Sequence, residues 1–149
     1  MTITEEIIKD YEEKANIMAS QSNHDGILFL LETLLNPNNI ICDDANIGTI
    51  VLECAPEFEM LSKDDERIIK FLNLLDSFMS KNLENIKDYI IQNLLIAKIV
   101  LCKYIGHDYT EAFTKAIEYS DRIIEKDPLY VHSYYKKVNI YNIEGNNSD

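Results

Sequence analysis

The chain has 149 residues, of which 46% are hydrophobic and 27% are charged. This length suits a single domain with one hydrophobic core, and the hydrophobic share is too high for a disordered chain. The formal net charge of −12 disfavours direct binding to nucleic acid or to acidic membranes, because both carry negative charge.

The first helix is predicted to begin near residue 5. Thr2 stands three residues before Glu5, which is the spacing of a capping box, and apolar residues follow at helical intervals as far as Met18. A short second helix is predicted over residues 27–35, and it stops there because the residue before Pro37 is pushed out of helical geometry.

The third and fourth helices carry acidic caps. Asp43 or Asp44 is expected to cap the third helix, which ends by Pro56, and Ser62 with Asp65 caps the fourth. One stripe of the fourth helix is predicted to face the core: Ile68, Ile69, Leu72, Leu75 and Met79.

The fifth helix is predicted over residues 82–104 and ends at Gly106. Its apolar run, residues 89–101, is too short for a membrane span, so we expect a core helix. The run is interrupted by Gln92, Asn93 and Lys98.

Two further helices complete the chain. The sixth covers residues 109–126, with Asp108 at its cap, and the seventh covers residues 129–141 and stops before Gly145. The sequence therefore predicts an all-α domain of about seven antiparallel helices, without a sheet. Periodicity leaves two arrangements open, a stack of helical hairpins and a closed bundle.

The negative charge lies in the first part of the chain. Residues 1–66 contain 15 Asp and Glu against 3 Lys and Arg, whereas residues 67–149 contain 11 of each kind. Two interpretations remain open for the acidic part: a solvated face, or a docking surface for a basic partner.

The cysteines indicate a reducing compartment. Cys42, Cys54 and Cys102 are odd in number and form no CxxC motif, and the N-terminal residues do not resemble a signal peptide. We therefore expect a cytoplasmic protein, with the nucleus as a second possibility, and three cysteines that act as buried apolar residues.

The last third of the chain resembles the tetratricopeptide repeat, a family of paired helices. Ala116 and Pro128 stand where the second helix of such a repeat has its small packing residue and its final Pro. Tyr134, Tyr141 and Gly145 stand where the first helix of the next repeat favours Trp, Tyr and Gly. The resemblance implies a stacked helical hairpin.

The resemblance covers residues 94–146 and departs from the family pattern in places. Ser120 replaces the usual aromatic residue, and Lys137 and Val138 replace the usual Leu-Gly pair. We thus divide the single domain into an acidic helical half, residues 1–80, and a repeat-like part, residues 81–149, whose last helix is expected to leave an apolar face for a partner.

In this family the inner face of the first helix of each pair usually binds the partner. Asn139 stands where members that bind chaperone tails have an Asn that holds a terminal carboxylate, whereas Tyr135 stands where they have Lys. The resemblance implies a partner-binding face made of His132, Tyr135, Lys136, Asn139, Asn142 and Ile143.

The sequence gives no sign of catalytic or cofactor chemistry. His24, His107 and His132 are far apart and lack metal-ligand spacing, and neither a phosphate-binding loop nor a nucleophile motif is present. No metal or cofactor is therefore expected.

We expect a non-catalytic protein-interaction scaffold, an adaptor or small subunit of a larger assembly. Two alternatives remain open: a co-chaperone that binds an extended acidic tail through Lys136 and Asn139, and, from another class, a compact helical enzyme.

Overall fold

The computed structural model describes residues 1–145 and contains seven helices and one pair of very short strands. The predicted all-α class is confirmed. The helices are α1 (Glu5–Ser20), α2 (His24–Leu34), α3 (Ile47–Phe58), α4 (Glu66–Asn82), α5 (Asp88–Ile105), α6 (Thr110–Lys126) and α7 (Val131–Gly145). The strands are β1 (Thr2–Ile3) and β2 (Ile40–Ile41), which pair in parallel.

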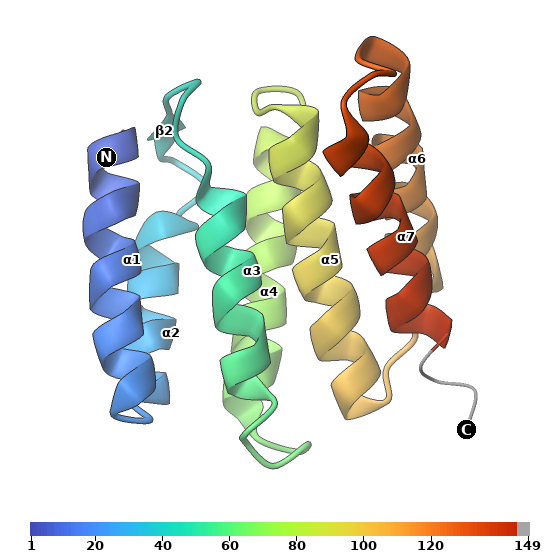
Figure 1. Ribbon diagram of the computed structural model, residues 1–149. Helices are drawn as coiled ribbons and strands as arrows, with labels where there is room; N and C mark the ends of the chain where they lie inside the picture. Colours follow the sequence, from blue (N-terminus) through green and yellow to red (C-terminus); the bar gives the residue numbers. More distant parts are fainter. Residues whose placement is uncertain (146–149) are drawn as a thin grey trace.

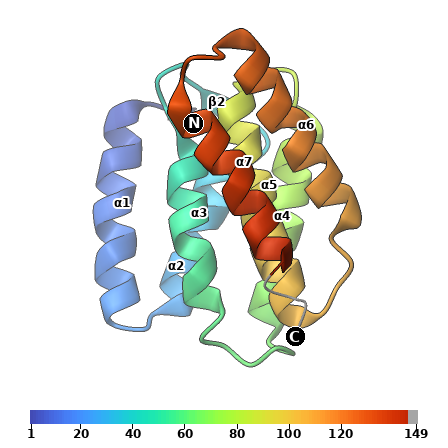
Figure 2. The same ribbon diagram turned by 45° about the vertical axis from the view of Figure 1, so that its right-hand side comes forward.

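The helices form two layers. Figure 1 shows α1, α3, α5 and α7 in one layer and α2, α4 and α6 behind them, with α1 at one end of the row and α6 and α7 at the other. In the turned view, α7 lies in front of α5 and beside α6, and it packs against both (Figure 2). Periodicity left open a stack of helical hairpins and a closed bundle. The row of helices in Figure 1 corresponds to the stack.

The first helix begins differently from the sequence prediction. Its N-cap is Thr4, whose Oγ1 accepts a hydrogen bond from the Ile7 amide at 3.3 Å, so the prediction of Thr2 was wrong. Thr2 instead lies in β1, where it pairs with Ile40. A strand of two residues has no detectable period of its own, and for this reason the sequence did not predict the strand pair.

The third helix begins and ends later than predicted. Its N-cap is Asn46, whose Oδ1 accepts a hydrogen bond from the Thr49 amide at 3.2 Å, so neither Asp43 nor Asp44 caps it. Pro56 lies inside the last turn and does not end the helix. A proline costs a helix one backbone hydrogen bond, and near the C-terminal end the packing of the following residues can offset that loss.

The other helix ends lie close to their predicted positions. Asp65 caps α4 by accepting a hydrogen bond from the Arg67 amide at 2.9 Å, and Gly106 ends α5 in the left-handed conformation, with φ of 77°. Four differences remain: α2 already begins at His24, α7 continues through Gly145, α5 begins at Asp88 and not at residue 82, and the N-cap of α6 is Tyr109 and not Asp108. Asn146, the last residue of the family resemblance, lies outside the described residues.

One hydrophobic core joins the two halves of the chain. Its buried members run from Ile3 to Ile140, and α5 is buried over most of its surface, as expected for a core helix. The predicted stripe of α4 was wrong at Ile69, which is exposed, while Phe71 and Phe78 of that helix are fully buried. Among residues 1–145, no helix combines the length and the hydropathy that a membrane crossing requires.

The three cysteines are free, and two of them are buried. Cys54 and Cys102 lie in the core as predicted, whereas Cys42 is only half-buried, contrary to the prediction. Burial raises the pKa of Cys54 to about 12 and raises the pKa of Cys102 as well. Both core thiols therefore stay protonated and unreactive near neutral pH.

Gly48 allows α3 and α5 to approach each other closely. A Cβ atom at this position would lie 2.8 Å from the Cβ of Asn93 and 2.9 Å from the carbonyl oxygen of Ile90. Both distances are shorter than carbon atoms tolerate, and a helix backbone cannot yield as a flexible side chain can. The packing of α3 on α5 therefore requires glycine.

We expect Gly48→Ala to lower the free energy of unfolding by about 1–3 kcal/mol through overpacking, even though Ala is the better helix former by about 1 kcal/mol. Gly145→Ala is the matched control, because a Cβ there meets no atom within 4 Å. Urea denaturation followed by circular dichroism measures both variants. A Gly48→Ala protein as stable as the Gly145→Ala control would contradict the conclusion that the packing of α3 on α5 requires glycine at position 48.

Candidate functional site

A groove of about 1000 Å³ lies where three helices of one layer begin and α6 ends. The N-terminal turns of α3, α5 and α7 line it, together with the last turn of α6. The lining residues are Asn46, Thr49, Ile86, Lys87, Asp88, Tyr89, Gln92, Asn93, Ile123, Lys126, Asp127, Tyr130, His132, Ser133 and Lys136. We call this site the α5–α7 groove.

Ion pairs fix the α6 side of the α5–α7 groove. Oδ1 of Asp88 lies 3.2 Å from Nη2 of Arg122, and Oδ2 of Asp88 lies 2.8 Å from Nζ of Lys126. These contacts join the first turn of α5 to the last turns of α6, so the two helices run in opposite directions. They also neutralise the Asp88 carboxylate, which is only 14% exposed.

The groove is a basic part of an acidic protein. Its lining contains Lys87, Lys126 and Lys136 against Asp88 and Asp127, while the whole chain has a formal net charge of −12. Three helix N-termini add partial positive charge at the same place, because their first amide groups have no partner inside the helix. The groove therefore favours negatively charged groups.

Two polar side chains of α5 are buried beneath the groove. Gln92 donates a hydrogen bond from Nε2 to the Ser120 hydroxyl at 2.7 Å, and that hydroxyl donates to the carbonyl oxygen of Ala116 at 2.8 Å. Ser120, which departs from the repeat-family pattern, thus serves as the partner of Gln92. The pair satisfies polar atoms that would otherwise be costly to bury.

Lys136 crosses the groove from α7 to α5. Its Nζ donates a hydrogen bond to Oδ1 of the buried Asn93. None of the ion pairs among residues 1–145 involves Lys136, and burial lowers its pKa below the usual lysine value. The ammonium group is thus partly removed from water without a carboxylate partner, which costs free energy in the ligand-free protein.

Ser133 adds an unused polar group to the same place. Its side chain is only 4% exposed, and its Oγ is the one buried side-chain polar atom in the described chain that makes no hydrogen bond. Such atoms are rare because leaving a buried hydroxyl unpaired costs about 1–3 kcal/mol. A bound group that accepts the Ser133 proton would recover this free energy.

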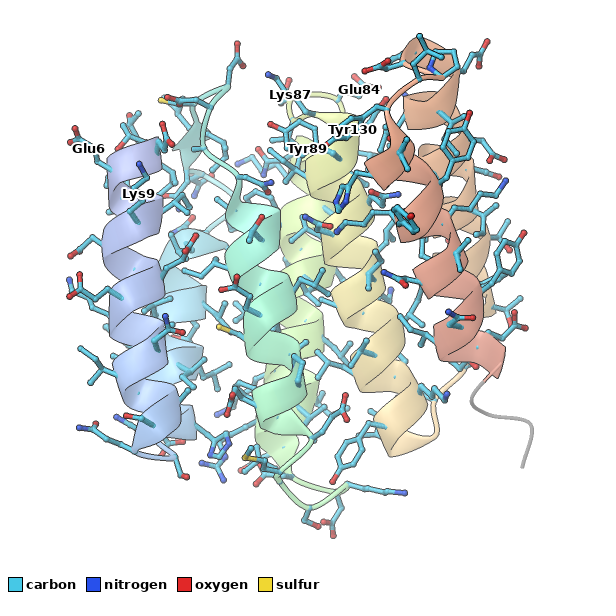
Figure 3. The ribbon with its side chains drawn as sticks, viewed as in Figure 1. Glu6, Lys9, Glu84, Lys87, Tyr89 and Tyr130 are labelled. Carbon is cyan, nitrogen blue, oxygen red and sulfur yellow. The ribbon has the colours of Figure 1, made fainter. Side chains whose placement is uncertain are left out.

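Aromatic side chains form the rim of the groove. Figure 3 places Tyr89 and Tyr130, together with Lys87, at the end of the molecule where α5 and α7 begin. Tyr89 and Tyr130 are both partly exposed. The ring centroid of Tyr130 lies 5.8 Å from that of His132. Rigid aromatic groups with a polar tip are well suited to hold a ligand at a wet interface.

The structure divides the residues that sequence analysis assigned to partner binding. His132 and Lys136 line the groove. Tyr135, Asn139 and Asn142 are exposed and lie outside its lining. Ile143 packs against the core, and its carbonyl oxygen accepts a hydrogen bond from Nζ of Lys103. The groove therefore includes two of the six predicted residues, and the partner-binding role of all six stays a prediction.

Sequence analysis missed most of the groove. The groove depends on Asn93 and Ser133, and on Tyr89 and Tyr130 at its rim, none of which was assigned a role. One signal was present: Gln92 and Asn93 interrupt an otherwise apolar run. Polar residues in a core helix need partners, and the partner positions could be known only from the packing of α6 and α7.

The first helix of the acidic half, α1, lies at the other end of the row. Figure 3 shows Glu6 and Lys9 on α1, away from the groove. Lys9 and Lys14 form ion pairs with Glu5 and Asp10, at 3.5 Å and 2.9 Å, on the surface of the same helix. No group of three His, Cys, Asp or Glu residues within residues 1–145 is arranged to hold a metal ion.

Comparison with protein-family models, with curated proteins and with solved structures found no match to this chain. The site is therefore interpreted from its own geometry.

We expect Lys136 and Lys137, adjacent in the chain, to have pKa values on opposite sides of the usual lysine value of 10.5. Burial lowers the pKa of Lys136, whereas a hydrogen bond with Asp121 raises that of Lys137. A pH titration of the lysine side chains by NMR measures both. In Asp121→Asn, the pKa of Lys137 should return toward 10.5 while that of Lys136 stays unchanged.

The sign of the pH effect follows from these directions. The pKa of Lys136 is lower in the folded state than in the unfolded state. At pH values between these two pKa values, the unfolded state therefore binds the proton of Lys136 more strongly. The contribution of Lys136 to the free energy of unfolding therefore rises with pH in the range below 10.5. A pKa of Lys136 at or above 10.5 would contradict its description as a desolvated group.

Proposed function

We propose that this protein is a non-catalytic binding protein that holds an extended segment of a protein partner in the α5–α7 groove. The observation that carries this proposal is the combination of an aromatic rim, a buried hydroxyl without a partner at Ser133, and an ammonium group without a carboxylate at Lys136. A groove of about 1000 Å³ has room for several residues of an extended chain. In the cell, the protein would act as an adaptor or as a small subunit of a larger assembly.

The two-layer arrangement supports the proposed relation to tetratricopeptide repeats. In that family the first helices of the pairs form the inner, partner-binding layer, and here α1, α3, α5 and α7 share one layer (Figure 1). The groove lies on three of these four helices. Buried Ala116 and the contact between Phe113 and Tyr141, whose ring centroids are 5.4 Å apart, join α6 to its neighbours.

The free cysteines support the proposed compartment. The pKa values of Cys54 and Cys102 are raised, and both thiols are buried. A protein with unpaired thiols fits a reducing environment, such as the cytoplasm or the nucleus.

A second candidate surface is favoured by the exposed side of α7 and of the loop before it. Its apolar side chains are unusually accessible, and Leu129 is 90% exposed. They are Leu129, Val131, Tyr134, Tyr135, Val138 and Tyr141. Apolar groups gathered in this way are typical of contact surfaces, so a partner of the groove could also be held here.

The groove can be tested with a library of random linear peptides selected on the immobilised protein. We expect Tyr89→Ala and Tyr130→Ala each to weaken the binding of selected peptides about tenfold, because aromatic groups at a rim carry much of the binding free energy. Phe29→Ala is the control, since this exposed residue lies on α2 in the other layer. Failure to select peptides, or peptides insensitive to both tyrosine variants, would contradict the proposal.

The co-chaperone alternative makes a different prediction for two residues of α7. If the tail-binding pattern of the repeat family applied, Lys136→Ala and Asn139→Ala would both abolish binding. In the proposal based on the groove, Lys136→Ala weakens binding and Asn139→Ala does not, because Asn139 lies outside the groove lining. Isothermal titration of one selected peptide against both variants separates the two alternatives.

A further inference from the structure

The bottom of the α5–α7 groove gathers hydrogen-bonding groups from two helices. The ammonium group of Lys136 lies against Asn93, and the unpartnered hydroxyl of Ser133 lies one helical turn before Lys136 on α7. The side-chain amide of Asn93 accepts the Lys136 bond through its oxygen. Lys136, Asn93 and Ser133 all line the groove, so the ammonium group and the free hydroxyl are both available there to a group that accepts hydrogen bonds.

A group that accepts hydrogen bonds from Lys136 and Ser133 should be negatively charged. Lys136 has no carboxylate within ion-pair distance, although Asp88 and Asp127 line the same groove. Asp88 is already paired with Arg122 and Lys126. A charge brought by a ligand would thus find an ammonium group that is not yet neutralised, in surroundings where water weakens the attraction less than at an open surface.

The position of the donors selects a side chain over a chain terminus. Asn93 lies between α3 and α7: Gly48 of α3 packs against its Cβ on one side, and Lys136 contacts its amide on the other. The groove is also lined by Asn46 and Thr49 of α3 and by Tyr130, just before α7. A bound segment that contacts both groups would pass Asn93 with its main chain intact and would present a side chain there.

We propose that Lys136, Asn93 and Ser133 form a subsite for the carboxylate of an Asp or Glu side chain in the bound segment. This inference rests on the proposed function, because it specifies the chemistry of the partner that the groove holds. The subsite differs from the pattern implied by the family resemblance, since it uses neither Tyr135 nor Asn139. It assigns a role to the buried Asn93 and to the buried, unpartnered hydroxyl of Ser133.

Peptides selected on the groove provide the first test. Each Asp or Glu in one selected peptide is replaced by Asn or Gln, and a version with an amidated C-terminus is made in parallel. We expect one acidic position whose replacement weakens binding about 10- to 100-fold, as for hydrogen bonds to charged groups. Amidation should leave the affinity unchanged. A loss on amidation alone would overturn the assignment in favour of a terminal carboxylate.

A double-mutant cycle connects that acidic position to the subsite. Lys136→Met should remove the same factor in affinity, and the acidic and neutral peptides should then bind the variant equally well. Lys137→Met is the matched control, because Lys137 pairs with Asp121 outside the groove lining and should leave the affinity unchanged. The proposal would be overturned if the Lys136→Met protein still bound the acidic peptide more tightly than the neutral one by the same factor as the unsubstituted protein.

A smaller substitution, at Ser133, provides a second test in case the Lys136→Met protein does not fold. Ser133→Ala removes only the unpartnered hydroxyl, so the free protein should be at least as stable as before while the acidic peptide binds several-fold more weakly. The two proposals can also fail separately. Groove-binding peptides without an acidic requirement would reject the subsite alone, whereas the absence of any groove-binding peptide would reject the proposed function.

Discussion

The close contact between α3 and α5 is the constraint on which the rest of the molecule depends. At Gly48 the two helices lie so near each other that no side chain fits between them. This contact holds α5 in the middle of the row, where it also packs against α4, α6 and α7. It further presses the backbone of α3 against Asn93, so the same contact that builds the core also fixes the position of the central residue of the groove.

The polar residues of α5 show a division of labour within one helix. Gln92 is satisfied inside the protein by Ser120, which belongs to α6, and therefore links two helices. Asn93 is satisfied only by Lys136 of α7, whose charge has no counterpart. The first residue stabilises the fold, whereas the second holds a cation at the surface of the core. Under the proposed function, the desolvated cation is a local cost in stability of the kind that functional sites commonly carry.

Sequence reasoning reached the helices but not their contacts. Periodicity located all seven helices, because that signal acts within a few residues of the chain, whereas the predicted caps of α1 and α3 were wrong. The β1–β2 pair was missed because it depends on a contact with residues near position 40. The groove was missed for the same reason: Asn93, Ser133 and Tyr130 become neighbours only when α5 and α7 pack. Lys136 and His132 were identified through the family resemblance, which also suggested Tyr135 and Asn139, and these two lie outside the groove lining.

The small number of buried residues on α7 affects how the protein would respond to a ligand. Only Ser133 and Ile140 of this helix are buried, while much of its apolar surface faces water. A helix with so few buried contacts opens locally at a lower cost in free energy than the core does. Because α7 also forms one wall of the groove, a bound segment would add buried contacts to this helix. Affinity would then include the free energy of holding α7 in place, and hydrogen exchange in α7 would slow as the groove fills.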